Sequence, residues 1–160
     1  MKSPDSQTVD LKKTVEDVVA LVDNDPRKTD SVEIKNRIPN GPSVRFDPDH
    51  LKQLILNVVI NSLDAIGGSG TIDFSLERKR KSNEGFVRLV ISDNGPGFPA
   101  DSLKSVFEPF YSTKKEGTGL GLALVRKMAV GNHGRVFARN KVTGGAEIVL
   151  DIPLDGAEHG

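Results

Sequence analysis

The stretch that decides the fold is DPDHLKQLILNVVINSLDAIGG, residues 47–68. Its first residues, Asp47 and Pro48, suit the N-cap and first turn of a helix, and Gly67 suits the end. The residues between are apolar on most sides, so we expect a long, largely buried helix over 47–66. Residues three or four apart share one side of a helix, and five polar residues with this spacing form a polar stripe: His50, Gln53, Asn57, Asn61 and Asp64. The sequence of the helix alone does not decide whether this stripe faces a cleft or solvent.

The segments on either side alternate between helical and extended patterns. Apolar residues at helical spacing predict helices over 8–22, with Thr8 or Asp10 as the cap, and over 119–130. A short helix is expected near 100–106. Alternation of apolar and polar residues predicts strands over 32–38, 44–46, 71–77, 86–92, 135–139 and 146–152. Because strands and helices interleave without a regular βαβ repeat, we expect an α+β fold. It would be a two-layer α/β sandwich whose helices cover one face of a mixed, mostly antiparallel sheet.

The composition excludes several classes of protein. The 160 residues suit one domain, and the absence of cysteine excludes a disulfide scaffold or a thiolate metal site. With 22 basic and 22 acidic residues the formal net charge is zero, which argues against a nucleic-acid partner. No apolar run could cross a bilayer, so we expect a cytoplasmic domain over 8–154, with a disordered N-terminus (1–7) and a flexible tail (155–160). We interpret the basic run 78–81 as a solvated turn rather than as a contact patch for a partner.

Two glycine-rich motifs lie in and after the long loop that precedes the last helix. DNGPGF, residues 93–98, follows a strand, so Asp93 would stand at the strand end beside glycines that let a ligand approach closely. GTGLGLAL, residues 117–124, opens a helix, where backbone N–H groups favour a phosphate. Between them, FEPFYSTKKE contains Lys114, a point charge suited to a terminal phosphate. The alternatives are an ordinary turn for the first motif and a flexible hinge for the second.

Together and in this order, these segments resemble the catalytic ATP-binding domain of two-component sensor histidine kinases, within the wider group of gyrase, heat-shock-chaperone and mismatch-repair ATPases. LILNVVINSLDA (54–65) is similar to the family's N box, DNGPGF to its G1 box, FEPFYSTK (107–114) to its F box and GTGLGLAL to its G2 box. The resemblance covers residues 8–154. The short lid STKKEGTGLGL is most similar to the nitrogen-regulation type of sensor kinase. The resemblance implies an ATP site between the helices and this lid.

The resemblance implies a role for each matching residue. Asn61 would bind Mg²⁺, Asn57 would support the phosphates, and Asp93 would take the adenine amine, while Gly97 lets the base approach. Lys114 and the backbone amides of GTGLGL would hold the β and γ phosphates, so the residues implied in catalysis are Asn57, Asn61 and Lys114. The full set implied to contact ATP is Asn57, Asn61, Asp64, Ala65, Asp93, Gly95, Gly97, Phe98, Lys114, Gly117, Thr118, Gly119, Leu120, Gly121 and Leu122.

Three positions depart from the family's pattern. Asn57 stands where the hydrolytic members carry a glutamate. An asparagine cannot act as a general base for water, which favours transfer over hydrolysis. Asp64 stands where many sensor kinases have a lysine, and it would repel a triphosphate unless it faces Mg²⁺, solvent or a basic partner. Ala146 stands where a Thr or Ser usually supports the adenine site, so that polar support is missing or replaced by water.

The family's phosphoacceptor histidine lies in a separate dimerising helical hairpin, and the three histidines here, His50, His133 and His159, do not fit that role. The resemblance therefore implies a domain that binds Mg·ATP and donates the γ-phosphate to a histidine on that hairpin, for onward transfer to a response regulator. We expect a monomeric isolated domain and a homodimeric full-length kinase that can be membrane-anchored. The alternatives are a stand-alone anti-sigma-type serine kinase, a docking module without catalysis and, least favoured, a gyrase-type hydrolytic ATPase.

Overall fold

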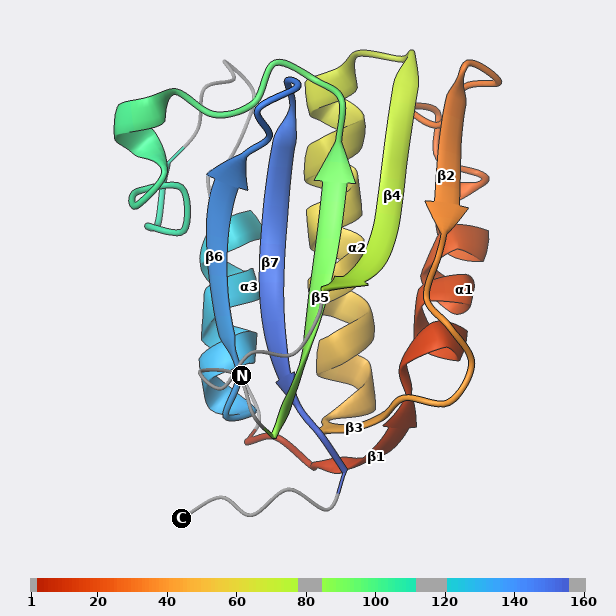
Figure 1. Ribbon diagram of the computed structural model, residues 1–160, viewed down its shortest axis with the longest axis vertical. Coiled ribbons are helices and arrows are strands. Elements are labelled where there is room, and N and C mark those ends of the chain that lie inside the picture. Colours follow the sequence, from red (N-terminus) through yellow and green to blue (C-terminus); the bar gives the residue numbers. More distant parts are fainter. Residues whose placement is uncertain (1–2, 78–84, 112–120, 156–160) are drawn as a thin grey trace.

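The computed structural model describes residues 3–77, 85–111 and 121–155. The three helices lie together on one face of the main sheet, so the described chain has two layers (Figure 1). In chain order the elements are β1 (Gln7–Asp10), α1 (Leu11–Val22), β2 (Val32–Asn36), β3 (Ser43–Phe46), α2 (Pro48–Ile66), β4 (Gly70–Glu77), β5 (Phe86–Asp93), a short 3-10 helix (Ala100–Ser102), α3 (Gly121–Gly131), β6 (Arg135–Asn140) and β7 (Ala146–Pro153).

Five strands form the main sheet, in the order β2-β4-β5-β7-β6. β2 and β4 run parallel, and the other three neighbouring pairs run antiparallel. β1 and β3 pair antiparallel in a separate two-stranded sheet. The expected α+β sandwich, with a mixed and mostly antiparallel sheet covered on one face by helices, is therefore confirmed.

The core lies between the main sheet and α2. Five residues of α2 are fully buried, namely Leu51, Leu54, Ile55, Val58 and Val59. The facing sheet contributes alternate residues of its central strands, as period-2 strands do: Ile72, Phe74, Leu89, Ile91 and Leu150. Each such side chain stabilises the fold by roughly 1.5–3 kcal/mol relative to exposure to water. The long helix thus fixes the domain's central layer and the direction of its polar stripe.

Both ends of α2 lie where the sequence predicts. At the start, Asp47 Oδ1 accepts hydrogen bonds from the backbone N–H groups of Asp49 (2.9 Å) and His50 (3.1 Å). At the end, Gly67 has a φ of 65°, and its N–H donates to the Leu63 carbonyl oxygen at 3.3 Å. A residue with a side chain is disfavoured in this left-handed conformation, so the glycine sets where the helix stops.

The first helix starts later than expected. α1 begins at Leu11 rather than at residue 8, and Asp10 is its N-cap, accepting from the Lys13 N–H at 3.1 Å. Thr8, the other candidate cap, lies in β1 instead. A strand of four residues is too short to show an alternating pattern, and Val9 happens to continue the helical spacing of α1.

The described part of the segment 1–7, expected to be disordered, contacts the rest of the domain. The Asp5 backbone N–H donates to Asp47 Oδ2 at 2.8 Å. β1 begins at Gln7, which pairs with Phe46 of β3. The polar composition of this segment signals exposure, but backbone hydrogen bonds hold it in place independently of its side chains.

Other boundaries differ by a few residues. The strand expected over 32–38 ends at Asn36, whose side-chain oxygen accepts the Ile38 N–H at 3.1 Å and turns the chain. Of the helix expected near 100–106 there is only the 3-10 helix, followed by turns. Serine side chains compete for backbone hydrogen bonds and weaken such a helix. Residues 119 and 120 of the last expected helix lie outside the described residues. Within the described ranges, no helix is both long and apolar enough to span a bilayer.

Candidate functional site

The predicted site residues that the structure describes gather at one end of the sheet. α2 and β5 both end there, and the turn between β6 and β7 lies beside them (upper part of Figure 1). α3 begins against α2, because the side-chain amide of Asn57 donates to the Gly121 carbonyl oxygen at 3.4 Å. Segments far apart in the sequence therefore meet around one region. Five predicted residues lie outside the described residues: Lys114, Gly117, Thr118, Gly119 and Leu120.

Asp93 is the last residue of β5, and it is buried, with 4% of its surface exposed. Its Oδ1 accepts hydrogen bonds from the backbone N–H groups of Gly95 (2.9 Å) and Ala146 (3.3 Å). A buried carboxylate needs such partners. Ala146, whose side chain has no polar group, thus contributes its backbone N–H to the hydrogen bonding of this carboxylate. The carboxylate has a fixed position at the end of a central strand.

The loop after Asp93 depends on close contact between backbones. Gly97 has a φ of 79°, and a Cβ atom there would lie 2.8 Å from the side-chain oxygen of Asn140. A Cβ atom on Gly145 would come within 2.1 Å of the Asp93 carbonyl oxygen. Neither position can accept a side chain without a shift of its neighbours. The glycines of DNGPGF and of the β6–β7 turn therefore let the two segments lie against each other.

Asn140, which the sequence analysis did not single out, holds the same loop. Its Oδ1 accepts from the Phe98 N–H at 2.9 Å, and its Nδ2 donates to the Phe98 carbonyl oxygen at 2.7 Å. Both polar backbone groups of one loop residue are thus bonded to a single side chain. A signal was present in the sequence: an asparagine at the end of a strand, followed by the turn glycines Gly144 and Gly145.

The polar stripe of α2 turns toward α3 at Asn57. The Gln53 Nε2 donates to Asn57 Oδ1 at 2.7 Å, and Asn57 in turn reaches the backbone of Gly121. Asn61 lies one turn further along the same side and is half-buried. Two asparagine amides on one side of a helix, beside the start of another helix, offer neutral donors and acceptors to a polar ligand.

Asp64 has a basic partner, which is one of the three conditions that the sequence left open for it. The guanidinium of Arg27 lies 3.5 Å from Asp64 Oδ1 and is held by two closer contacts with Asp25, at 2.7 and 2.9 Å. Hydrogen bonding to Arg27 lowers the pKa of Asp25 to about 2. Arg27 comes from the loop after α1, in which no sequence pattern indicated a site.

Two further predicted residues contribute through packing and backbone. Ala65 is half-buried, and its carbonyl oxygen would lie 3.2 Å from a Cβ atom placed on Gly95. Leu122 is buried in the core, so only its backbone is suited to contact a ligand. Tyr111, which is not one of the predicted site residues, has a buried hydroxyl with no hydrogen-bond partner among the described residues.

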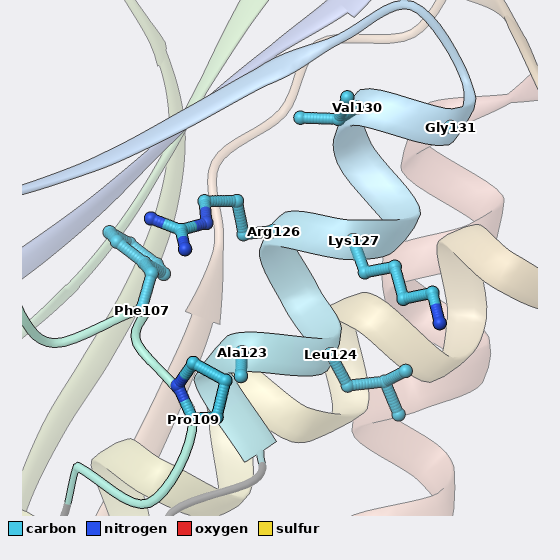
Figure 2. Close-up of a pocket in the computed structure, with 8 residues that line it drawn as sticks. All are labelled: Phe107, Pro109, Ala123, Leu124, Arg126, Lys127, Val130 and Gly131. Carbon is cyan, nitrogen blue, oxygen red and sulfur yellow. The ribbon is translucent and has the colours of Figure 1, made fainter.

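A sizeable cavity lies elsewhere, on the outer side of α3. It has a volume of about 720 Å³ and lies between the loop residues Phe107 and Pro109 and one side of α3 (Figure 2). Its lining is mostly apolar, with two basic side chains. The cavity does not include Asp93 or the asparagines of α2, so it is a separate feature.

The fold and the site define a histidine-kinase-type ATP-binding domain, and solved structures share the arrangement. The mycobacterial sensor histidine kinase MprB is similar with a TM-score of 0.79 at 25% identity, over 92% of this chain and 97% of that one. Full-length ShkA in complex with AMPPNP is similar with a TM-score of 0.79 at 26% identity, over 96% and 32% of the two chains. ThkA in complex with the response regulator TrrA has a TM-score of 0.76 at 25% identity, over 92% and 41%.

The chain belongs to the family of histidine kinase-, DNA gyrase B- and HSP90-like ATPases, whose model matches residues 46–156. The sensor histidine kinase ZraS of Klebsiella oxytoca is 32% identical over 152 residues, 95% of this chain and 32% of ZraS. The sensory histidine kinase/phosphatase NtrB of Rhodobacter capsulatus is 40% identical over 105 residues, 60% and 30% of the two chains. The chain spans about a third of the length of these relatives. The resemblance to sensor kinases, including the nitrogen-regulation type, is confirmed.

Proposed function

We propose that this domain binds Mg·ATP and donates the γ-phosphate to a histidine on a separate dimerising domain, for onward transfer to the receiver domain of a response regulator. The observation that carries the proposal is Asp93, a buried carboxylate fixed at the end of a central strand by two backbone N–H groups. The similar structure of ShkA holds AMPPNP, and that of ThkA holds a response regulator. The reaction would take place in the cytoplasm.

In this proposal Asp93 accepts a hydrogen bond from the adenine amino group. A carboxylate accepts but does not donate when ionised, so it favours adenine over a base that presents an oxygen at the same place. The base would approach beside Gly97, in the loop that Asn140 holds through both backbone groups of Phe98. Specificity for the base would therefore depend on groups that are already in place before it binds.

Asn61 would be the protein ligand of Mg²⁺, and Asn57 would support the phosphates. Among the described residues, no three His, Cys, Asp or Glu side chains gather as a metal site. A single side-chain oxygen from Asn61 fits Mg²⁺, which is commonly held by one or two protein oxygens together with phosphate oxygens and water. When bound, the ion would neutralise charge on the phosphates. The amides of Gly121 and Leu122, with Lys114 and residues 117–120, would hold the β and γ phosphates.

The proposed chemistry is transfer rather than hydrolysis. Asn57 is an amide, which cannot take a proton from water as a general base. The described histidines are also poor acceptors within this chain. His50 is held on α2, where its Nδ1 lies 3.2 Å from the Asn132 side-chain nitrogen, and His133 is in a turn with a φ of 64°. The proposal therefore places the acceptor histidine on another segment.

Calorimetric titration with Mg·ATP is the direct test of nucleotide binding. We expect binding in the micromolar range, slow phosphate release and no label on the chain after incubation with radiolabelled ATP. Addition of a separate histidine-bearing dimerisation domain should then yield an acid-labile phosphoramidate on that domain. An acid-stable phosphoserine on a partner would instead favour the serine-kinase alternative. Folded protein that binds no adenine nucleotide would exclude the proposal.

A further inference from the structure

The loop after α1, residues 23–31, is fastened to the end of α2 and the start of β4. The Thr29 hydroxyl donates to the Gly68 carbonyl oxygen at 2.6 Å, and the Gly70 N–H donates to the Ser31 carbonyl oxygen at 3.1 Å. Figure 1 shows this loop beside the upper ends of α2 and β4. The loop is therefore held at the same end of the fold as the candidate ATP site.

Arg27, in this loop, has one edge of its guanidinium occupied by Asp25. Its Nε and Nη2 lie 2.9 and 2.7 Å from the two carboxylate oxygens of Asp25, a bidentate arrangement that fixes the plane of the group. This hydrogen bonding raises the pKa of Arg27, so the side chain is always charged. The remaining terminal nitrogen, Nη1, lies 3.5 Å from Asp64 Oδ1. Asp25 thus orients Arg27 so that its other edge meets Asp64.

Asp64 lies on the polar stripe of α2, three residues after Asn61 and seven after Asn57. This spacing puts the three side chains on one side of the helix, with Asp64 about 4.5 Å further along the axis than Asn61. In the proposed function the two asparagines face Mg²⁺ and the phosphates, so Asp64 stands beside the most highly charged part of the ligand. A carboxylate without a cation beside it would repel every phosphate group that binds there.

The charges around Arg27 do not cancel completely. The carboxylates of Asp25 and Asp64 meet one guanidinium, so a single negative charge remains, and loss of Arg27 would leave two. The side chains of Arg27 and Asp64 are 42% and 30% exposed, so water and salt screen them only in part. Lys28, the other cation of the loop, is directed to the loop itself, with its Nζ 3.4 Å from the Thr29 carbonyl oxygen. The repulsion of an anionic ligand by Asp64 therefore depends on Arg27.

We propose that Arg27 determines how strongly the site favours nucleotides with more phosphate groups, because it neutralises Asp64 beside the bound phosphates. Arg27 acts through Asp64, as a positioning residue, and does not contact the nucleotide. The inference rests on the proposed function, since it takes the phosphates to lie along the polar stripe of α2. Its consequence is that the base and the phosphates are recognised by separate groups, the base by Asp93 and the phosphates under the control of Arg27.

Calorimetric titration of the wild type and of Arg27→Ala with Mg·ATP, Mg·ADP and adenosine tests the proposal. We expect the variant to bind Mg·ATP about tenfold more weakly and Mg·ADP with a smaller loss, and the loss should shrink as salt is raised. The affinity for adenosine, which has no phosphate, should not change. An equal loss for all three ligands would mean that the variant alters the shape of the site, and would overturn the proposal. Tighter binding of Mg·ATP would also overturn it, because Asp64 would then act on the metal ion.

A double-mutant cycle tests whether Arg27 acts through Asp64. Asp64→Asn removes the charge that Arg27 neutralises and keeps a side chain of the same shape. In that background Arg27→Ala should change the affinity for Mg·ATP by less than about twofold. A tenfold loss that persists there would show that Arg27 acts on the nucleotide directly, and the proposal would be wrong. Arg27→Lys keeps the charge and should bind Mg·ATP within about threefold of the wild type. A lysine variant as weak as Arg27→Ala would show that charge is not the cause.

Two control variants separate this ion pair from general effects of charge. Lys28→Ala removes a positive charge from the same loop and should weaken Mg·ATP by less than about twofold, since exposed charges are screened. Arg37→Ala removes the partner of Asp73, to which Arg37 is bonded at 2.8 Å on the main sheet, and should bind Mg·ATP as the wild type does. Urea denaturation of every variant establishes that it is folded. A loss in either control as large as that of Arg27→Ala would contradict the proposal.

The same titrations separate the failure of this proposal from that of the proposed function. A folded wild type that binds no adenine nucleotide would overturn both. A wild type that binds Mg·ATP, together with an Arg27→Ala variant that binds it equally well, would leave the proposed function in place and overturn only the role of Arg27.

Discussion

The two ends of α2 use similar polar residues in different ways. At the lower end in Figure 1, the side-chain oxygens of Asp47 accept three backbone N–H groups, those of Asp49, His50 and Asp5. Asn132, which follows α3, accepts the Asp47 N–H at 2.8 Å and donates to the Met128 carbonyl oxygen at the same distance. These groups are buried and bonded to backbone from several elements. They hold the fold.

From the middle of α2 to its upper end, the contacts that the polar stripe makes with other elements are longer and exposed. Asn57, in the middle of the helix, reaches Gly121 at 3.4 Å, and Asp64, in the last turn, reaches Arg27 at 3.5 Å. Short buried bonds of polar groups stabilise a fold, whereas polar groups with long contacts at a loop-lined end can exchange partners when a ligand binds. The comparison predicts that substitutions at the lower end change stability, and that those at the upper end change ligand binding.

Asn132→Ala should have the largest effect, and on stability alone. It leaves the buried Asp47 N–H without its acceptor and removes the side-chain bond to Met128, for an expected loss of about 3 kcal/mol in the free energy of unfolding. Urea denaturation measures it, with the exposed Asn24→Ala as control, for which we expect a change within about 0.5 kcal/mol. Loss of Mg·ATP affinity in Asn132→Ala without loss of stability would contradict the division between the two ends.

Asp93→Asn extends the comparison to the site itself. The asparagine keeps one oxygen to accept the Gly95 and Ala146 N–H groups but presents an amide N–H₂ where the carboxylate would accept from adenine. We expect Mg·ATP affinity to fall by about 100-fold, or about 2.7 kcal/mol, with a much smaller change in stability. Calorimetry measures the affinity. Asp73→Asn on β4, where Arg37 pairs with the carboxylate at 2.8 Å, is the control and should bind as the wild type does.

Most of the fold could be predicted from the sequence, because its signals are local. Asp47, Pro48 and Gly67 mark both ends of α2, and alternation marks the strands on either side of it. β1 could not be predicted, because four residues carry no period and its partner β3 lies more than 30 residues away. The sheet order could not be derived from periodicity either, since pairing between distant strands depends on packing that no local pattern encodes.

The site was predictable where glycines and a strand end coincide. Asp93 lies at the end of a strand, and the two glycines that follow it predicted a close approach of a ligand or, as the alternative, an ordinary turn. Asn140 and Arg27 were missed because each contacts a residue about 40 positions away. The turn glycines after Asn140 indicate a turn but not its partner, and a single arginine in a polar loop resembles any surface residue. Such contacts depend on which segments the sheet brings together, and that becomes visible only in three dimensions.

Asn61→Ala tests the upper end of α2 with a smaller effect. If its oxygen is a ligand of Mg²⁺, the affinity for Mg·ATP should fall about tenfold, or about 1.4 kcal/mol, while the affinity for ATP in the presence of a chelator stays the same. Calorimetry with and without Mg²⁺ separates the two. Lys52→Ala, on the same helix but outside the stripe, should change neither affinity. An equal loss with and without the ion would show that Asn61 acts on the nucleotide or the fold instead.

Asp47→Asn tests the lower end through pH, and we expect the smallest change. Burial raises the pKa of Asp47, but the N–H groups of Asp5, His50 and Asp49 together outweigh it, so the pKa lies below the ordinary value of 3.8. A carboxyl with a lowered pKa stabilises the fold fully above its unfolded value, and this stabilisation is lost as pH falls through the folded value. The wild type should therefore exceed Asp47→Asn by about 1 kcal/mol at neutral pH, with the gap narrowing below about pH 4.

Urea denaturation at a series of pH values from neutral to acid measures this gap. Asp47→Ala is the matched comparison, because alanine neither caps the helix nor titrates. This variant should be less stable than Asp47→Asn by about 1 kcal/mol at every pH. A gap between wild type and Asp47→Asn that stays constant with pH would mean that the ionised carboxylate adds nothing to the cap. In that case neutral hydrogen bonding alone would hold the lower end of α2.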